Sequence, residues 1–386
     1  MISGLTLLFL LIALNLYVGT RIRLNGETRL QQNMVIAMLW IAPFVGLLFA
    51  LGHTKPALTQ TPAAEPLLPG TVAGPAPLQL SFAGLPPLAL APHMQTSNGY
   101  PFFRWQALEE WTAALPDPQR AVLASQVTKR AWLSHLRDAF GSTLRLHEAD
   151  DAFVLSPLAN NVVLATAAYV TTTRARINKL LAGLAQFPEH DKSVLVVAPD
   201  ETDYYHYVST YYPDGGHFAD SGGMFINHGC PHFVVALNDL ANIEPVIAHE
   251  LTHSALAHLH LPRWLDEGLA VNTEMRLTRG GGTGYTQHQL HAMHLAFWGP
   301  QEMQEFWSGA SFFRPDNGNL LSYELARVLV AHMGSDWARF SSFARAAERS
   351  DGGAQAAQDV FGVSLGTLVC ALLEKEYDAA WEPAAQ

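Results

Sequence analysis

The residues in this sequence most able to carry chemistry are His249 and His253, with Glu250 directly after the first histidine. On a helix, residues i and i+4 lie on one face about one turn apart, so the two imidazoles can bind one zinc ion. Glu250 lies about 100° around the helix from His249, where it can reach a zinc-bound water without being a ligand. Zinc lowers the pKa of such a water toward about 7, and a glutamate general base then makes it a nucleophile.

A catalytic zinc needs a third protein ligand and one open position. One arrangement places a glycine and then a third histidine after the pair, but here those positions hold Leu256 and Leu259. The other arrangement ends the first helix, turns back and supplies a glutamate from a second helix. Pro262 is a suitable helix breaker, and the segment WLDEGLAV after it is expected to form the second helix. Glu267 is the predicted third ligand, and Gly268 would let the two helices approach closely.

The sequence HELTH followed by WLDEGLA resembles the gluzincin zinc metallopeptidases, close to the peptidase MA-like bacterial proteins. The resemblance extends roughly over residues 193–373. It implies that His249, His253 and Glu267 bind zinc, and that Glu250 is the general base. It also implies that a tyrosine or histidine on a later helix stabilises the oxyanion, and Tyr323 in LLSYELA is the best-placed match.

The same resemblance predicts an edge strand ahead of the motif helix that pairs with an extended substrate backbone. Residues 222–229, GGMFINHG, are the candidate. Some gluzincins also place a carboxylate four residues after the ligand glutamate to orient a histidine, and here that position is Val271. Asn272 and Glu274 are both candidates to replace it, and the sequence alone does not choose between them.

Three other features carry both a functional and an ordinary structural interpretation. For His288, His291 and His294, a solvated or cleft-lining helix face is favoured over a second metal site. The tyrosines between positions 204 and 212 are expected to pack rather than bind a ligand. The loop TRGGGTG lacks the Lys-Ser/Thr of a phosphate-binding loop and is expected to be a flexible rim or lid.

The composition excludes one class of partner. The 386 residues carry a formal net charge of −11, and 15% are charged, with no dense basic run. A nucleic-acid-binding role would need a basic stripe, so the expected partner is a peptide or protein substrate. The two cysteines, Cys230 and Cys370, form no CxxC pair, so no cysteine-based zinc motif is present. A disulfide between them and two free core thiols both remain open.

Two uncharged apolar segments, residues 2–20 and 35–52, are each near the length that spans a hydrocarbon core. The loop between them carries three arginines against one glutamate, which by the positive-inside rule places it in the cytoplasm. We therefore expect a transmembrane hairpin over residues 1–52 in a bacterial inner membrane, with the remaining chain facing the periplasm or cell exterior. A cleaved signal peptide is the alternative for the first segment, but MISGLT has no basic residue.

The remaining chain divides by composition. Residues 53–98 are rich in proline and alanine and are expected to tether a domain, although the leucines and Phe82 can instead lie along its surface. In residues 99–386 the predicted strands precede the motif and the helices follow it, which predicts an α+β, zincin-like peptidase domain. The expected function is membrane-anchored, zinc-dependent peptide hydrolysis. The alternative is a catalytically inactive binding or regulatory membrane protein on the same fold.

Overall fold

The computed structural model describes residues 67–384 apart from positions 142, 212–222 and 279–283. Leu67–Gln386 form one compact unit, and the predicted membrane segments at 2–20 and 35–52 lie outside the described residues. Within the described part, no single helix is long and apolar enough to cross a membrane. The helices α14 (Ala354–Phe361) and α15 (Leu365–Leu372), bent by 84°, meet the length and composition criteria only when they are taken together.

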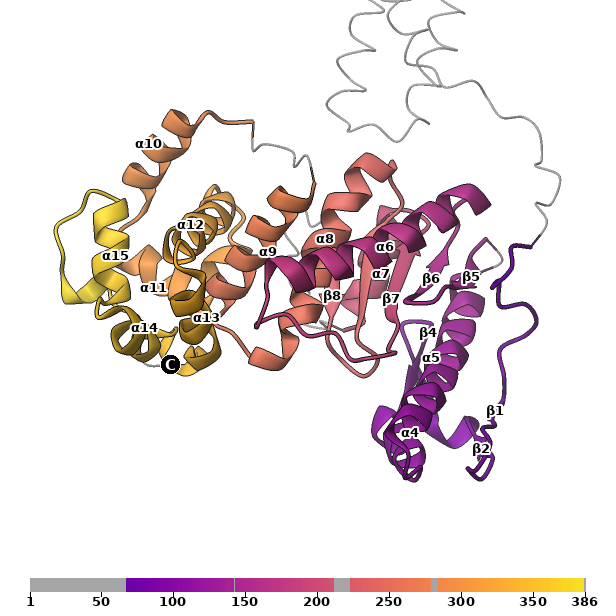
Figure 1. Ribbon diagram of the computed structural model, residues 1–386. Helices are drawn as coiled ribbons and strands as arrows, with labels where there is room; N and C mark the ends of the chain where they lie inside the picture. Colours follow the sequence, from indigo (N-terminus) through magenta and orange to yellow (C-terminus); the bar gives the residue numbers. More distant parts are fainter. Residues whose placement is uncertain (1–66, 142, 212–222, 279–283, 385–386) are drawn as a thin grey trace, which may run out of the picture. The chain divides into compact units, whose positions relative to one another are not determined.

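The centre of this unit is a five-stranded mixed sheet in the order β5-β6-β7-β9-β8 (Figure 1). β5 (Arg145–Glu148) and β6 (Ala152–Ser156) form an antiparallel pair. β7 (Ser193–Ala198) and β9 (His232–Ala236) run parallel to β6, and β8 (Gly223–Ile226) lies antiparallel to β9. Among the described strands β8 has a neighbour on one side only, so the predicted edge strand is an edge strand.

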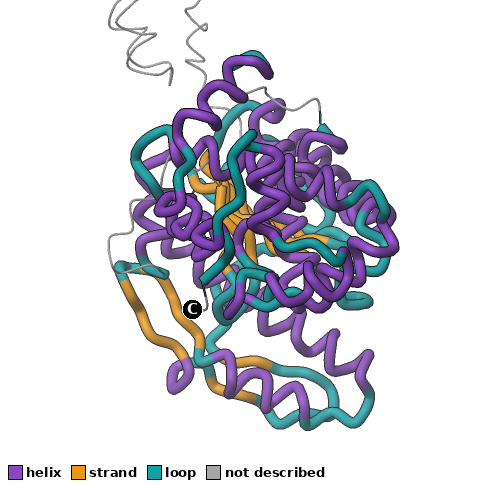
Figure 2. The backbone as a smooth tube through the Cα atoms, turned by 90° about the vertical axis from the view of Figure 1, so that its left-hand side faces the viewer, coloured by secondary structure: helices purple, strands orange, loops and turns teal. Residues whose placement is uncertain are grey.

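Both faces of the sheet are buried. Because alternate residues of each strand point to opposite sides, each strand contributes side chains to two cores. Leu195 and Val197 of β7 belong to a core shared with α6 (Asn160–Leu180) and the C-terminal helices. Val194 and Val196 belong to a second core, which is covered by α4 (Trp105–Ala113), α5 (Pro118–Phe140) and α7 (Glu201–Ser209). In Figure 2 the strands of the sheet lie behind helices of the C-terminal part.

Local capping chemistry explains where several helices begin. The Asp117 carboxylate accepts hydrogen bonds from the first backbone N–H groups of α5, and Pro118 occupies the first helical position. Asp200 caps α7 in the same way. A reciprocal capping box between Thr286 and Gln289 starts α10 (Gln287–Phe297). The tyrosines of α7 pack as predicted, since Tyr204 and Tyr207 are buried in the second core.

The helices that carry the motif form an α-turn-α unit. α8 (Leu240–Leu256) continues into a 3-10 turn, η2 (Ala257–Leu259), and His260 then adopts a left-handed conformation with φ 52°. Pro262 forms the N-cap of α9 (Arg263–Leu277), so the predicted break is where the chain reverses. α9 is in turn packed against α12 (Gly318–Met333).

Gly268 permits a different helix contact from the one predicted. A Cβ atom at this position would lie 2.5 Å from the backbone oxygen of Ala326 and 2.6 Å from Cγ2 of Val330. Both residues belong to α12, so the glycine allows α9 to approach α12 rather than α8, the contact expected from the sequence. A side chain of any size here would push the two helices apart.

The remaining elements complete an α+β fold in which all the described strands precede α8 and only helices follow it. At the N-terminal end lie β1 (Gln79–Leu80), β2 (Leu88–Ala89), η1 (Ala91–His93), β3 (Met94–Ser97) and β4 (Tyr100–Phe103). Leu80 and Leu90, from the segment expected to be a tether, are buried in the second core, and Phe82 packs against it. After α10 come α11 (Pro300–Ser308), η3 (Ala310–Phe313), α13 (Trp337–Ala346), η4 (Arg349–Asp351) and η5 (Ala379–Trp381).

Candidate metal centre

Three of the predicted site residues come together between α8 and α9. His249, His253 and Glu267 each offer one ligand atom, and these atoms all lie within 4.8 Å of one another. The Nε2 atoms of the two histidines lie 3.3 Å and 3.4 Å from the same carboxylate oxygen, Oε2 of Glu267. In the part of the chain that the structure describes, no other group of three histidine, cysteine or acidic side chains meets this criterion. The arrangement is the one that the motif spacing predicts.

The chemistry of these atoms fits a metal ion. Oε2 of Glu267 is buried and has no hydrogen-bond partner among the described residues, although two imidazole nitrogens face it. A buried carboxylate oxygen in this position carries a desolvation cost that a cation bound between the three atoms would offset. Two imidazole nitrogens and one carboxylate oxygen form a donor set that zinc accepts, as do several other divalent ions.

A carboxylate also lies beside the second nitrogen of each histidine. Nδ1 of His249 lies 3.1 Å from Oε2 of Glu274, and Nδ1 of His253 lies 3.0 Å from Oδ2 of Asp266. In the tautomer with the proton on Nδ1, each ring donates to its carboxylate and turns Nε2 toward Glu267. Histidine ligands of metals almost always have such partners, so both rings are oriented as ligands should be.

The structure resolves the choice that the sequence left open. Glu274 lies two turns after Glu267 on the same face of α9 and therefore reaches His249. Asn272 instead donates hydrogen bonds to the backbone oxygens of Gly268 and Arg327, and so holds α9 against α12. The partner of His253, Asp266, was not assigned a role from sequence. Its position in the first turn of α9, directly before the ligand glutamate, was the available signal.

The charged groups of the centre shift one another's pKa values. Burial lowers the pKa of His249, but the carboxylates of Glu267 and Glu274 more than offset this and raise the pKa to about 9. The pKa of His253 is likewise raised, because Asp266 and Glu267 outweigh burial. Burial raises the pKa of Glu267, yet the two imidazoles bring it below its usual range. The concentration of acidic groups around the two rings favours a bound cation.

Glu250 lies beside the centre but outside the ligand group. Its side chain is buried against the edge of the sheet, and the backbone of Phe225 in β8 forms a hydrogen bond with it. Burial raises the pKa of Glu250, while the nearby His249 and His253 act in the opposite direction. A carboxylate with a raised pKa is suited to accept a proton near neutral pH and release it again.

Tyr323 projects from α12 toward the same region. Its ring packs edge-on against Phe312, with the centroids 5.1 Å apart. Burial raises the pKa of Tyr323, and the negative charges of Glu267 and Glu250 raise it further. The phenol is therefore within electrostatic reach of both carboxylates and keeps its proton, so that it can act as a hydrogen-bond donor.

Arg263, which had no predicted role, borders the centre. Its Nη1 atom lies 3.7 Å from Oε1 of Glu267, the other oxygen of the candidate ligand. Its guanidinium group lies over the ring of Phe313, 4.6 Å from the centroid. The four-residue spacing from Arg263 to Glu267 on one helix was the sequence signal for this contact.

The predicted histidine row does not converge on a second site. Nε2 of His291 lies 3.2 Å from a carboxylate oxygen of Glu374, and His294 accepts a hydrogen bond from the indole N–H of Trp298 at 2.8 Å. Burial lowers the pKa of His294 to about 4. The two rings therefore have separate partners. Residues 279–283 of the predicted glycine-rich loop lie outside the described residues. Both cysteines are free and buried.

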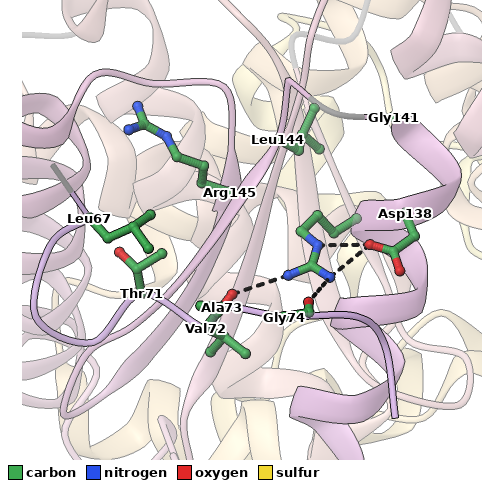
Figure 3. Close-up of a pocket in the computed structure, with 10 residues that line it drawn as sticks. Leu67, Thr71, Val72, Ala73, Gly74, Asp138, Gly141, Leu144 and Arg145 are labelled. Atoms are coloured by element: carbon green, nitrogen blue, oxygen red, sulfur yellow. Dashed lines mark hydrogen bonds and ion pairs between the residues drawn. The ribbon is translucent and has the colours of Figure 1, made fainter. Parts of the chain in front are cut away.

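A separate pocket of about 510 Å³ lies near the start of the described chain (Figure 3). Arg137 in this pocket donates hydrogen bonds to the backbone oxygens of Val72 and Gly74 and pairs with Asp138, so its charge is already neutralised. The pocket shares no residue with the candidate metal centre; its lining consists of Leu67, Thr71, Val72, Ala73, Gly74, Arg137, Asp138, Gly141, Leu144 and Arg145.

Comparison with known proteins adds no family assignment. No protein-family model matches this chain, and no curated protein matches it either. The function of this chain is therefore inferred from the donor atoms of His249, His253 and Glu267 and from the residues that surround them.

Proposed function

We propose that this chain is a membrane-anchored, zinc-dependent metallopeptidase on a zincin-like fold. The observation that carries the proposal is the convergence of two imidazole nitrogens on one buried carboxylate oxygen of Glu267. Carboxylates at both Nδ1 atoms support the same conclusion, because they orient the two rings as metal ligands. When bound, zinc would polarise the scissile carbonyl and make water a better nucleophile.

The chain's own residues have distinct roles in this proposal. Glu250 accepts the proton of the attacking water and delivers it to the leaving amine, for which its raised pKa is suited. Tyr323 donates its phenolic hydrogen to the oxygen that gains negative charge. His249, His253 and Glu267 hold the metal, and Glu274 and Asp266 fix the orientation of the two rings.

The edge strand provides a place for the substrate backbone. The outer edge of β8 has no described strand beside it, and the backbone of Phe225 in this strand bonds to Glu250. An extended peptide that adds to β8 would therefore lie next to the proposed general base. Main-chain hydrogen bonds would hold it there with little dependence on its side chains.

The cellular location is part of the proposal and depends on sequence. Residues 2–20 and 35–52 would form a transmembrane hairpin in a bacterial inner membrane, and the arginine-containing loop between them would lie in the cytoplasm. The catalytic unit would then face the periplasm. A reporter fused after Gln386 tests this orientation, and activity of a cytoplasm-only reporter at that position would contradict it.

The test of the activity uses the full chain purified in detergent. Elemental analysis should find about one zinc per chain, as expected for one three-ligand catalytic site. His253→Ala should lose the metal, whereas Glu250→Gln should keep the metal and lose hydrolysis of a broad peptide library. His332→Ala, at an exposed histidine on α12, is the matched control and should retain both properties. Zinc without hydrolysis would identify a binding or regulatory protein instead, and absence of zinc binding would contradict the metallopeptidase.

A further inference from the structure

Arg263 places a positive charge at the border of the candidate metal centre without using its hydrogen-bonding capacity there. Its 3.7 Å contact with Oε1 of Glu267 is too long for a hydrogen bond, and its side chain is 44% exposed. Among the described residues its guanidinium makes no hydrogen bond. An arginine carries five N–H donors in a planar fork, so a polar ligand can still occupy them.

The guanidinium is nevertheless held in place. It lies over the ring of Phe313, which is 49% exposed, at 4.6 Å from the centroid. Its stem passes over Gly309, where a Cβ atom would lie 2.8 Å from Cδ of Arg263. This cation–π contact does not occupy the N–H donors of the guanidinium. Because the head group is already positioned, binding a ligand costs less side-chain entropy than it would with a mobile arginine.

The positive charge of Arg263 also reaches the residues that are proposed to carry out the reaction. Its positive charge opposes the increase that Glu267 and Glu250 produce in the pKa of Tyr323. The guanidinium is therefore within electrostatic reach of the phenol as well as of Glu267. A peptide whose carbonyl lies between Glu250 and Tyr323 would bring its neighbouring groups close to Arg263.

We propose that Arg263, supported by Phe313, is a carboxylate-binding subsite that selects peptides with a carboxylate close to the bond that is cut. The inference rests on the proposed peptidase function and specifies its substrate class. A planar guanidinium can donate two parallel hydrogen bonds to one carboxylate. The carboxylate can belong to an acidic side chain or to the C-terminus of the peptide, since both present the same group.

Peptide binding is measured in the zinc-loaded full chain with the Glu250→Gln substitution, which separates binding from cleavage. One peptide sequence is made in three forms: with one glutamate and a C-terminal amide, with glutamine and an amide, and with glutamine and a free C-terminus. Calorimetry should show that at least one carboxylate form binds about tenfold more tightly than the neutral form. Adding Arg263→Gln should abolish this preference, and Arg263→Lys should retain part of it because the charge remains without the planar fork.

The control is Arg276→Gln, at an exposed arginine in the last turn of α9, and it should leave the preference intact. Zinc content is measured for every variant. A preference unchanged by Arg263→Gln would overturn the proposal, and so would loss of zinc together with the preference, because Arg263 would then act only through Glu267. Cleavage without a carboxylate preference would support the peptidase function and contradict the subsite. Arg263-dependent binding without any cleavage would support the subsite and contradict the peptidase.

Discussion

Nδ1 of His249 lies 3.1 Å from Oε2 of Glu274, on the face of α9 that also carries Glu267. One helix thus supplies both a candidate ligand and the carboxylate that orients another ligand. Because seven residues make two helical turns, Glu267 and Glu274 present their carboxylates to the same side. The orientation of His249 is therefore fixed by the geometry of α9 rather than by a separate loop.

Removing this carboxylate should weaken metal binding. We expect Glu274→Ala to lower zinc affinity by about 10–100-fold, because His249 loses the group that fixes its tautomer and ring orientation. Competition with a chromophoric chelator measures the affinity. Glu376→Ala, at an exposed glutamate far along the chain, serves as the control. Equal affinity in Glu274→Ala and in the unmodified chain would show that the contact does not support a metal ligand.

The role proposed for Tyr323 predicts an effect on turnover rather than on metal binding. We expect Tyr323→Phe to reduce kcat by about 10²–10³-fold, the usual effect of losing one oxyanion donor, with zinc content unchanged. Steady-state hydrolysis of a peptide found in the library screen provides the measurement, with Tyr285→Phe at an exposed tyrosine as the control. If kcat stays the same, Tyr323 is a packing residue against Phe312.

The close contact between α9 and α12 predicts that replacing Gly268 with alanine destabilises the fold. Helix propensity alone would make Gly268→Ala stabilising by about 1 kcal/mol. The added Cβ would instead lie 2.5 Å from the backbone oxygen of Ala326, so we expect a loss of about 1–3 kcal/mol in the free energy of unfolding. Urea unfolding measures this change. Met275→Ala, at an exposed position of the same helix, should alter stability by less than about 0.5 kcal/mol.

A buried histidine on the other face of the sheet should make stability depend on pH. Nε2 of His232 lies 2.8 Å from the hydroxyl of Tyr207, and its Nδ1 lies 2.7 Å from the backbone oxygen of Cys230. Burial lowers the pKa of His232 to about 4. The unfolded chain, with an ordinary histidine pKa of about 6.5, therefore binds a proton first as the pH falls. Stability must then decrease from about pH 6.5 down to about pH 4.

Between pH 7 and pH 5 this linkage should reduce the free energy of unfolding by about 2 kcal/mol. In His232→Gln that part of the decrease should disappear, because glutamine has no proton to gain. Urea unfolding of both chains at the two pH values gives the comparison, and His332→Gln controls for an exposed histidine. The other titrating groups are common to both chains, so a decrease of the same size in both would show that His232 does not titrate as described.

Sequence patterns determined the local structure of this protein well. The spacing of His249 and His253 requires that they share a helix face, and Pro262 ends the first helix wherever the rest of the chain lies. The continuous apolar run of β7 is typical of a buried strand, and the segment GGMFINHG contains β8. These features follow from backbone geometry within a few residues, so a single sequence contains them.

Tertiary structure decided which side chains face one another across neighbouring elements. It assigned Glu274 to His249, Asp266 to His253, and Gly268 to α12. It also brought Phe313, fifty residues later in the chain, against Arg263. Helical periodicity determines which residues share a face, but the packing of the whole core determines which helix that face meets and at what angle.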